Sequence, residues 1–348
     1  MRKCLRSQCL LNRKAINHMK RFWKENTMKH FRFIPIVLIV TFLMAACGTA
    51  AVPTSINPPL RIAVNLWPGL YPAAIAQEQG FFAKHNVQVE IHYYESYPQT
   101  YADLLVGKVD GLSAIVGDTL LINNQKGLKF VFPVDASDGA DEFIVGSDVQ
   151  SAADLKGKRI GAGFGTYGEL YVRTLLQQND IALTDITMVN SPAENAAAAF
   201  QSDVDAIHTY EPYASEALKR GGHVLSTSSD FPNLMLGTMT FPASLVEDRP
   251  QDIQAFTDAW FEAVDWMYAH PQEVPAVVAK VFGVKPEDVW FGGDKVFTRA
   301  EAKALMQPGN DYSSAYYVTQ TYIDFLVASN SLTARPNPED LIDTSFLK

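Results

Sequence analysis

The sequence is poor in cysteine, and no cysteine follows residue 47. The three cysteines of the 348-residue chain are Cys4, Cys9 and Cys47. Residues 48–348 therefore cannot form a disulfide, bind a metal through thiolates or use a cysteine nucleophile. The motifs GxSxG, HExxH and GxxxxGKS/T are also absent, and the five histidines beyond residue 47 lack a metal-ligand spacing such as i, i+4. We therefore expect neither a metal, nor a cofactor, nor hydrolase chemistry.

Positive charge is scarce outside the N-terminal segment. Ten of the 29 Lys and Arg residues, but only one of the 38 Asp and Glu residues, lie in residues 1–46, so the remainder carries a net charge of −18. Such a body repels nucleic acid and anionic membrane surfaces, and we expect no nucleic-acid partner. With 47% hydrophobic and 19% charged residues the chain can bury a large core, and its length suits two lobes of ordinary size.

The longest apolar run indicates export. Residues 33–46 (FIPIVLIVTFLMAA) form an apolar run of 14 residues, which is too short to span a bilayer as a helix. Basic residues precede this run. We predict a signal peptide over 1–46; a signal of ordinary length would begin at Met28, which suggests an over-extended start. The segment LMAAC resembles a bacterial lipobox, although Met stands where Leu is usual. Cys47 is thus a predicted lipidation site and 47–59 a tether.

The body of the chain alternates between strand and helix patterns. Short apolar or alternating runs that predict strands are separated by segments with helical spacing, which is typical of an α/β protein with parallel strands. This pattern restarts near residue 143, and residues 250–329 are mostly helical. The predicted strands are 60–66, 87–94, 111–115, 128–134, 143–146, 155–163, 186–190, 204–208 and 223–226.

Two lobes joined by two crossings explain this order with the fewest assumptions. Two extended crossings would make a hinge, and ligands of open α/β sheets bind beyond the carboxyl ends of strands, so a cleft is expected between the lobes. The predicted parts are lobe 1 (60–140 plus 242–329), lobe 2 (146–235), hinge strands (141–146 and 235–241) and a C-terminal tail (330–348).

Four segments resemble one family. LWPGLYPAAIAQEQGFFAKHNVQVE (66–90), VDASDGADEFIV (134–145), DLKGKRIGAGFGTYGELYVRTLL (154–176) and VDAIHTYEPYASEAL (204–218) are similar, in this order, to the nitrate/sulfonate/taurine and thiamine-pyrimidine binding family. The resemblance covers roughly residues 60–330. It implies the type II periplasmic-binding fold, with two mixed sheets flanked by helices and a hinge cleft.

Polar and aromatic residues that follow the predicted strands are the candidate ligand contacts. Aromatic side chains can stack on a planar ligand, free amides before a helix attract anions, and carboxylates accept from ligand N–H groups. Each type also has a purely structural use, as loop packing or helix capping. The candidates are Trp67, Tyr71, Ser96, Asp118, Asp135, Thr166, Tyr167, Tyr210 and Glu211.

The resemblance implies a substrate-binding lipoprotein of an ABC importer rather than an enzyme. We expect a monomer that is exported, anchored to the membrane through Cys47, faces the periplasm or the cell exterior and delivers a small solute to a permease. Two solute classes stay open: an organosulfonate, taurine-like or related anion is expected from its frequency in the family, and a hydroxymethylpyrimidine-type thiamine precursor is the alternative. A sensor subunit with the same cleft is a further alternative. Pyrimidine synthases of the wider family need a cysteine-rich motif, which this body lacks.

Overall fold

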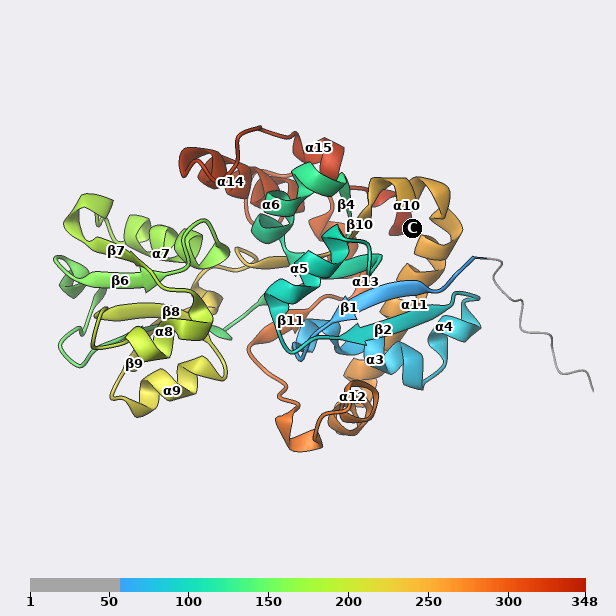
Figure 1. Ribbon diagram of the computed structural model, residues 1–348, viewed down its shortest axis with the longest axis horizontal. Helices are drawn as coiled ribbons and strands as arrows, with labels where there is room; N and C mark the ends of the chain where they lie inside the picture. The colour runs from blue at the N-terminus through green and yellow to red at the C-terminus, as the bar shows by residue number, and fades with distance from the viewer. Residues whose placement is uncertain (1–56) are drawn as a thin grey trace, which may run out of the picture. The chain divides into compact units, whose positions relative to one another are not determined.

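The computed structural model describes residues 57–348. The predicted signal peptide and Cys47 lie outside the described residues. Within them the chain forms two β-sheets, each flanked by helices (Figure 1). No helix of residues 57–348 combines the length and the apolar character needed to cross a bilayer.

The first sheet has six strands in the order β11-β4-β10-β3-β1-β2. Strand β1 pairs in parallel with β2 and β3, whereas β10 runs antiparallel to both β3 and β4. The sheet is mixed because β10 enters it from the other lobe. Its strands are β1 (Leu60–Val64), β2 (Val89–Tyr93), β3 (Gly111–Ile115), β4 (Leu128–Ser137), β10 (Leu236–Pro242) and β11 (Asp294–Val296).

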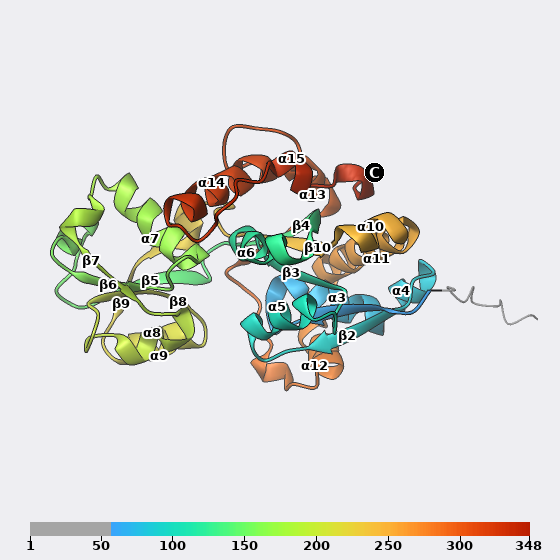
Figure 2. The same cartoon turned by 45° about the horizontal axis from the view of Figure 1, so that its top comes forward.

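Helices cover both faces of the first sheet (Figure 2). Helices α6 and α14 pack together on one face, and α3 and α11 on the other. The apolar stripe of α11 is buried: the rings of Trp260 and Phe261 lie 5.7 and 5.1 Å from that of Phe132 on β4. The helices of this lobe are α3 (Tyr71–Glu78), α4 (Phe81–Lys84), α5 (Tyr97–Leu105), α6 (Val116–Lys126), α10 (Ala243–Asp248), α11 (Pro250–Ala269), α12 (Val274–Phe282), α13 (Arg299–Leu305), α14 (Ala315–Ala328) and α15 (Pro338–Leu341).

The second sheet has five strands in the order β7-β6-β8-β5-β9. Strand β6 pairs in parallel with β7 and β8, and β5 runs antiparallel to β8 and β9, so this sheet is mixed as well. Its strands are β5 (Asp141–Val145), β6 (Arg159–Ala162), β7 (Thr187–Asn190), β8 (Ala206–Tyr210) and β9 (His223–Thr227), and its helices are α7 (Tyr167–Gln178), α8 (Ala193–Ala199) and α9 (Tyr213–Lys219).

The chain passes between the sheets twice, but not where the sequence pattern predicts. The segment 141–146 is almost entirely β5, a full member of the second sheet, and 235–241 belongs mostly to β10 of the first. The connections are instead residues 138–140 and 228–235. The prediction was wrong by a few residues because strand-forming sequence continues through each crossing into the next sheet.

The segment predicted as a C-terminal tail is part of the first lobe. Ile342 forms a parallel bridge with Phe130 of β4, and the amide of Asp343 donates to the Phe130 carbonyl at 2.9 Å. Leu341, Ile342 and Phe346 are buried. Residues 330–348 therefore cover the sheet beside β4 rather than trailing from it.

Candidate functional site

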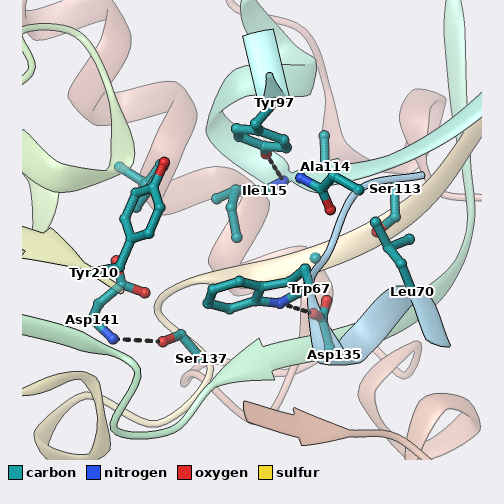
Figure 3. A pocket seen from close by; sticks show the side chains of 13 residues that line it. Trp67, Leu70, Tyr97, Ser113, Ala114, Ile115, Asp135, Ser137, Asp141 and Tyr210 are labelled. Atoms are coloured by element: carbon teal, nitrogen blue, oxygen red, sulfur yellow. Dashed lines mark hydrogen bonds between the residues drawn. The ribbon is translucent and has the colours of Figure 1, made fainter. Parts of the chain in front are cut away.

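A cavity of about 80 Å³ lies between the two lobes, beyond the carboxyl ends of β1 and β3 (Figure 3). The loop after β1, the ends of β3 and β4 and the start of β10 form most of its wall, and the second lobe adds Asp141 and two tyrosines. This is where ligands of open α/β sheets bind. The lining residues are Asn65, Trp67, Leu70, Tyr97, Ser113, Ala114, Ile115, Asp135, Ser137, Asp141, Tyr167, Tyr210 and Gly237.

Trp67 is held by a buried carboxylate. Its indole N–H donates to Asp135 Oδ2 at 2.7 Å (Figure 3). A Cβ added at Gly69 or Gly237 would come within 2.0 Å of an oxygen of Asp135, so both positions must be glycine for the carboxyl to fit between the two backbone segments. Asp135 therefore orients the indole ring that lines the cavity.

Asp135 shares its site with a second carboxyl. Asp294, at the start of β11, lies within hydrogen-bond reach of it. Burial raises the pKa of both groups, and the charge of Asp135 raises the pKa of Asp294 further. Two carboxylates in one buried site cannot both ionise readily.

Aromatic rings join the lobes across the cavity. The ring of Tyr210 on β8 meets that of Trp67 edge to face, with centroids 6.3 Å apart and an angle of 84°. Trp290 meets Trp67 in the same manner at 5.3 Å. The hydroxyl of Tyr210 donates to Glu194 Oε1 at 3.0 Å. Trp67 is thus fixed by Asp135 on its own lobe and faces the second lobe with its ring.

A larger cavity of about 320 Å³ adjoins the first and shares Tyr97 and Tyr167 with it. It lies between α5 and the start of α6 on one lobe and the starts of α7 and α8 on the other. Its lining residues are Tyr97, Pro98, Tyr101, Asp118, Gly163, Phe164, Thr166, Tyr167, Gly168, Asn190, Pro192, Ala193, Glu194 and His208.

Asp118 is the buried acid of this second cavity. Only 7% of it is exposed, and its Oδ2 accepts from the hydroxyls of Tyr97 at 3.2 Å and Tyr101 at 3.0 Å. The Tyr97 oxygen in turn accepts from the amide of Ile115 at 3.0 Å. Burial raises the pKa of Asp118 to about 6 against the lowering effect of the two tyrosines, and the charge of Glu194 raises it further.

A buried acid and histidine lie between the two cavities. Asp141 lines the first and His208 the second, and His208 Nε2 is 3.0 Å from Asp141 Oδ1. Both side chains are almost fully buried. Although the two atoms are close, the geometry of their contact is not that of a hydrogen bond. The rings of Tyr167 and Tyr171 flank the imidazole, with centroids 5.6 and 5.1 Å away.

At the helix start that was predicted to attract an anion, two backbone amides already donate to side chains of this chain. The amide of Gly165 donates to Glu169 Oε2 at 2.8 Å, and the amide of Gly168 donates to Thr166 Oγ1 at 3.2 Å. Glu169 is buried and also binds Arg173. The positive end of α7 is therefore neutralised by the chain's own carboxylate, which leaves it poorly suited to a sulfonate.

The two cavities have a lining of one electrical sign. Their charged groups are Asp118, Asp135, Asp141 and Glu194, with His208 beside them, and none of the described lining residues is Lys or Arg. Within residues 57–348 no cluster of three or more His, Cys, Asp or Glu is arranged to hold a metal ion. Six aromatic rings share the wall with these groups, so the arrangement suits a small solute with a positive charge or several N–H donors.

Comparison with known proteins identifies the family. The model of the NMT1-like family matches residues 55–283. The chain belongs to the NMT1-like family. It is 26% identical over 287 residues to a protein of Brucella abortus named "Putative binding protein", an alignment covering 79% of this chain and 83% of the relative.

Two solved structures have a similar fold. The alkanesulfonate-binding protein SsuA from Xanthomonas axonopodis pv. citri, bound to MOPS, has a TM-score of 0.64 and 20% identity, covering 84% of this chain and all of that one. The desulfurization enzyme DSZB has a TM-score of 0.57 and 17% identity, covering 84% and 98%. At these identities the likeness concerns the fold, and the predicted two-lobed, type II periplasmic-binding fold is confirmed.

The site of this NMT1-like protein contains most of the predicted residues. Trp67, Asp135, Tyr167 and Tyr210 line the first cavity, and Asp118, Thr166 and Tyr167 the second. Their roles in binding stay a prediction.

Three predicted residues do not line either cavity. Tyr71 is buried and its hydroxyl donates to the Trp290 carbonyl at 2.9 Å, so it packs within the first lobe. Ser96 is exposed before α5. Glu211 is exposed and accepts from the Ser215 hydroxyl at 2.7 Å, as an acid at a helix start often does.

Several lining residues were missed by sequence reasoning. Tyr97, Tyr101 and Glu194 were not among the predicted contacts, and His208 was considered only as a zinc ligand. The proline after Tyr97 marks a helix start directly behind a strand, which is a signal that could have identified this tyrosine.

Proposed function

We propose that the protein is the solute-capturing subunit of an ABC importer, which binds a small molecule between its lobes and delivers it unaltered to a membrane permease. One observation carries this proposal: both lobes contribute to the wall of each cavity, with Trp67 facing Tyr210. A solute in this position contacts both lobes at once and stabilises their closed arrangement. A sensor subunit would use the same cleft.

Export and lipid attachment belong to the same proposal. The apolar run 33–46 followed by Cys47 supports a cleaved signal with an acylated cysteine, and periplasmic relatives of the same fold agree with export. In a bacterial host that is fed an alkyne-bearing fatty acid, we expect label on the wild type and on Cys9→Ser, but none on Cys47→Ser. Label on Cys47→Ser would remove the anchor from the proposal.

We propose binding without catalysis. The fold also occurs in a desulfurization enzyme, so fold alone does not decide this question. The absence of cysteine after residue 47 and the lack of a hydrolase motif support a binding role. After prolonged incubation with excess protein, mass spectrometry should recover any bound solute unchanged.

Of the two solute classes that the sequence leaves open, the ring-bearing, N–H-rich class has more support than the organosulfonate. Trp67 and Tyr97 offer ring faces, and Asp135 offers an acceptor. The start of α7 was expected to hold a sulfonate, but the amide of Gly165 there donates to Glu169.

The test is a binding screen with two matched variants. Thermal shifts and calorimetry with aminopyrimidines, taurine, alkanesulfonates, nitrate and bicarbonate should identify a solute that stabilises the folded protein by mass action. Trp67→Phe should weaken binding, whereas Trp266→Phe, outside both cavities, should not. If Trp67→Phe binds as tightly as wild type for every ligand found, the proposed cleft is not the binding site.

A further inference from the structure

The second cavity has features that the proposed capture of a neutral or anionic solute does not explain. It is the larger of the two, and its acids come from opposite lobes: Asp118 from α6 and Glu194 from α8. The two are close enough for the charge of Glu194 to raise the pKa of Asp118. Two carboxylates that face one cavity repel each other unless a positive group lies between them.

The hydrogen bonds of these acids leave an oxygen free on each. Both tyrosine hydroxyls that reach Asp118 donate to Oδ2, and Tyr210 donates to Oε1 of Glu194. Within residues 57–348 no donor reaches Asp118 Oδ1 or Glu194 Oε2 with hydrogen-bond geometry. Asp118 is 7% exposed and lines the cavity, so its remaining oxygen can accept from a ligand there.

A second unsatisfied atom belongs to the same wall. His208 is 1% exposed, and its Nε2 makes no aligned hydrogen bond with any described residue. This atom lies 3.0 Å from Oδ1 of Asp141, which adds a further acid behind the ring. A polar ligand in the cavity would therefore lie next to a wall whose net charge is negative.

Four aromatic rings also belong to the wall. Tyr97 and Tyr101 meet edge to face with centroids 4.9 Å apart, and Tyr167 and Phe164 lie opposite on the second lobe. Ring faces beside carboxylates attract ammonium groups through the quadrupole of the ring. A sulfonate or nitrate would meet neither a described Lys or Arg side chain here nor a free amide of Gly165.

We infer that the solute is a small organic cation whose ammonium or amidinium group lies between Asp118 and Glu194 in the second cavity, while its less polar part extends towards Trp67. This inference rests on the proposed function, which it deepens by naming the charge of the solute and the residues that recognise it. Binding of the cation neutralises the repulsion between acids of opposite lobes, so the same contact that gives specificity also favours closure.

The experiment compares probes of one shape and opposite charge. Calorimetry at pH 7.5 and low salt is performed with benzylamine and benzenesulfonate, and with choline and nitrate. We expect the two cations to bind and the two anions not to bind. Asp118→Asn and Glu194→Gln should each weaken the cations at least about tenfold, because each leaves only one carboxylate to the charge. Glu211→Gln, the same change on an exposed acid outside the cavities, should bind like wild type.

The outcomes separate this inference from the proposal beneath it. If benzenesulfonate or nitrate binds and Asp118→Asn preserves or strengthens that binding, the solute is an anion and the inference is overturned, while capture in the cleft still stands. If cations bind but neither variant weakens them, the assigned residues are wrong. If no probe and no member of the wider screen binds, the proposed function fails together with the inference. Glu194 is partly exposed, so Glu194→Gln keeps the test valid even if Asp118→Asn unfolds.

Discussion

Replacing Asp118 by Asn should stabilise the protein while removing ligand recognition. Asp118 is 7% exposed, and burial raises its pKa to about 6 from a usual value near 3.8. At about 1.4 kcal/mol per pKa unit, holding this carboxylate ionised in the folded state costs up to about 3 kcal/mol relative to the unfolded chain. Asn has nearly the same shape, keeps one oxygen for a tyrosine hydroxyl and carries no charge, so most of this cost should disappear.

The effect has a definite pH window. Because the folded pKa of Asp118 lies above the unfolded one, the cost is absent below about pH 3.8, grows between pH 4 and 6, and is complete above pH 6. The free energy of unfolding of Asp118→Asn should therefore match that of wild type near pH 4. It should exceed the wild-type value by up to about 3 kcal/mol at pH 7.5.

Urea unfolding without ligand at both pH values measures this difference. Circular dichroism and tryptophan fluorescence should be followed together, because two lobes can unfold separately and a single free energy then loses its meaning. Glu211→Gln provides the control, since this acid is exposed. A variant that is less stable than wild type by the same amount at both pH values would refute the reasoning, because Asp118 would then stabilise the fold through its hydrogen bonds.

Three further changes test single contacts. Trp67→Ala should weaken solute binding by at least about 1.4 kcal/mol, a factor of ten in calorimetry, and unchanged affinity would remove the indole from the site. Tyr71→Phe should lose about 1 kcal/mol of stability with its hydrogen bond to the Trp290 carbonyl, while solute affinity stays constant; a drop in affinity would restore Tyr71 as a contact. Thr298→Ala removes the capping box of α13 and should lower the free energy of unfolding, measured by urea titration, by about 1 kcal/mol, with Thr298→Ser as the variant that retains the cap.

The sequence predicts the residues that follow a strand directly. Trp67 and Asp135 stand at the ends of β1 and β4, and the carboxyl ends of strands in an α/β sheet lie at the ligand edge, so their place in the cavity follows from strand order alone. Asp118 and Tyr167 follow from the same rule, each near a helix start behind a strand. The fold class could be predicted because strand and helix patterns alternate clearly in both halves.

Other features depend on contacts between distant segments. Glu194 lies in an alanine-rich helix, and only the approach of the other lobe brings it near Asp118. The pairing of Asp294 with Asp135 depends on β11, a strand of three residues that is too short to recognise from its sequence. Glu169 fills the start of α7 because its side chain folds back onto Gly165, and a sequence gives no sign of which carboxylate does so.

The filled start of α7 explains how one fold can serve solutes of opposite charge. The positive end of a helix attracts an anion, and a binding protein for sulfonates can use it directly. In this chain Glu169 occupies that end and is itself held by Arg173, so the helix contributes no net attraction for an external anion. The field in the cleft is then determined by Asp118, Asp135 and Glu194, which favour a positive solute. In this chain the charge preference of the cleft therefore follows from side chains at the starts of α6, α7 and α8 and at the end of β4, and such side chains can change without altering the backbone that carries them.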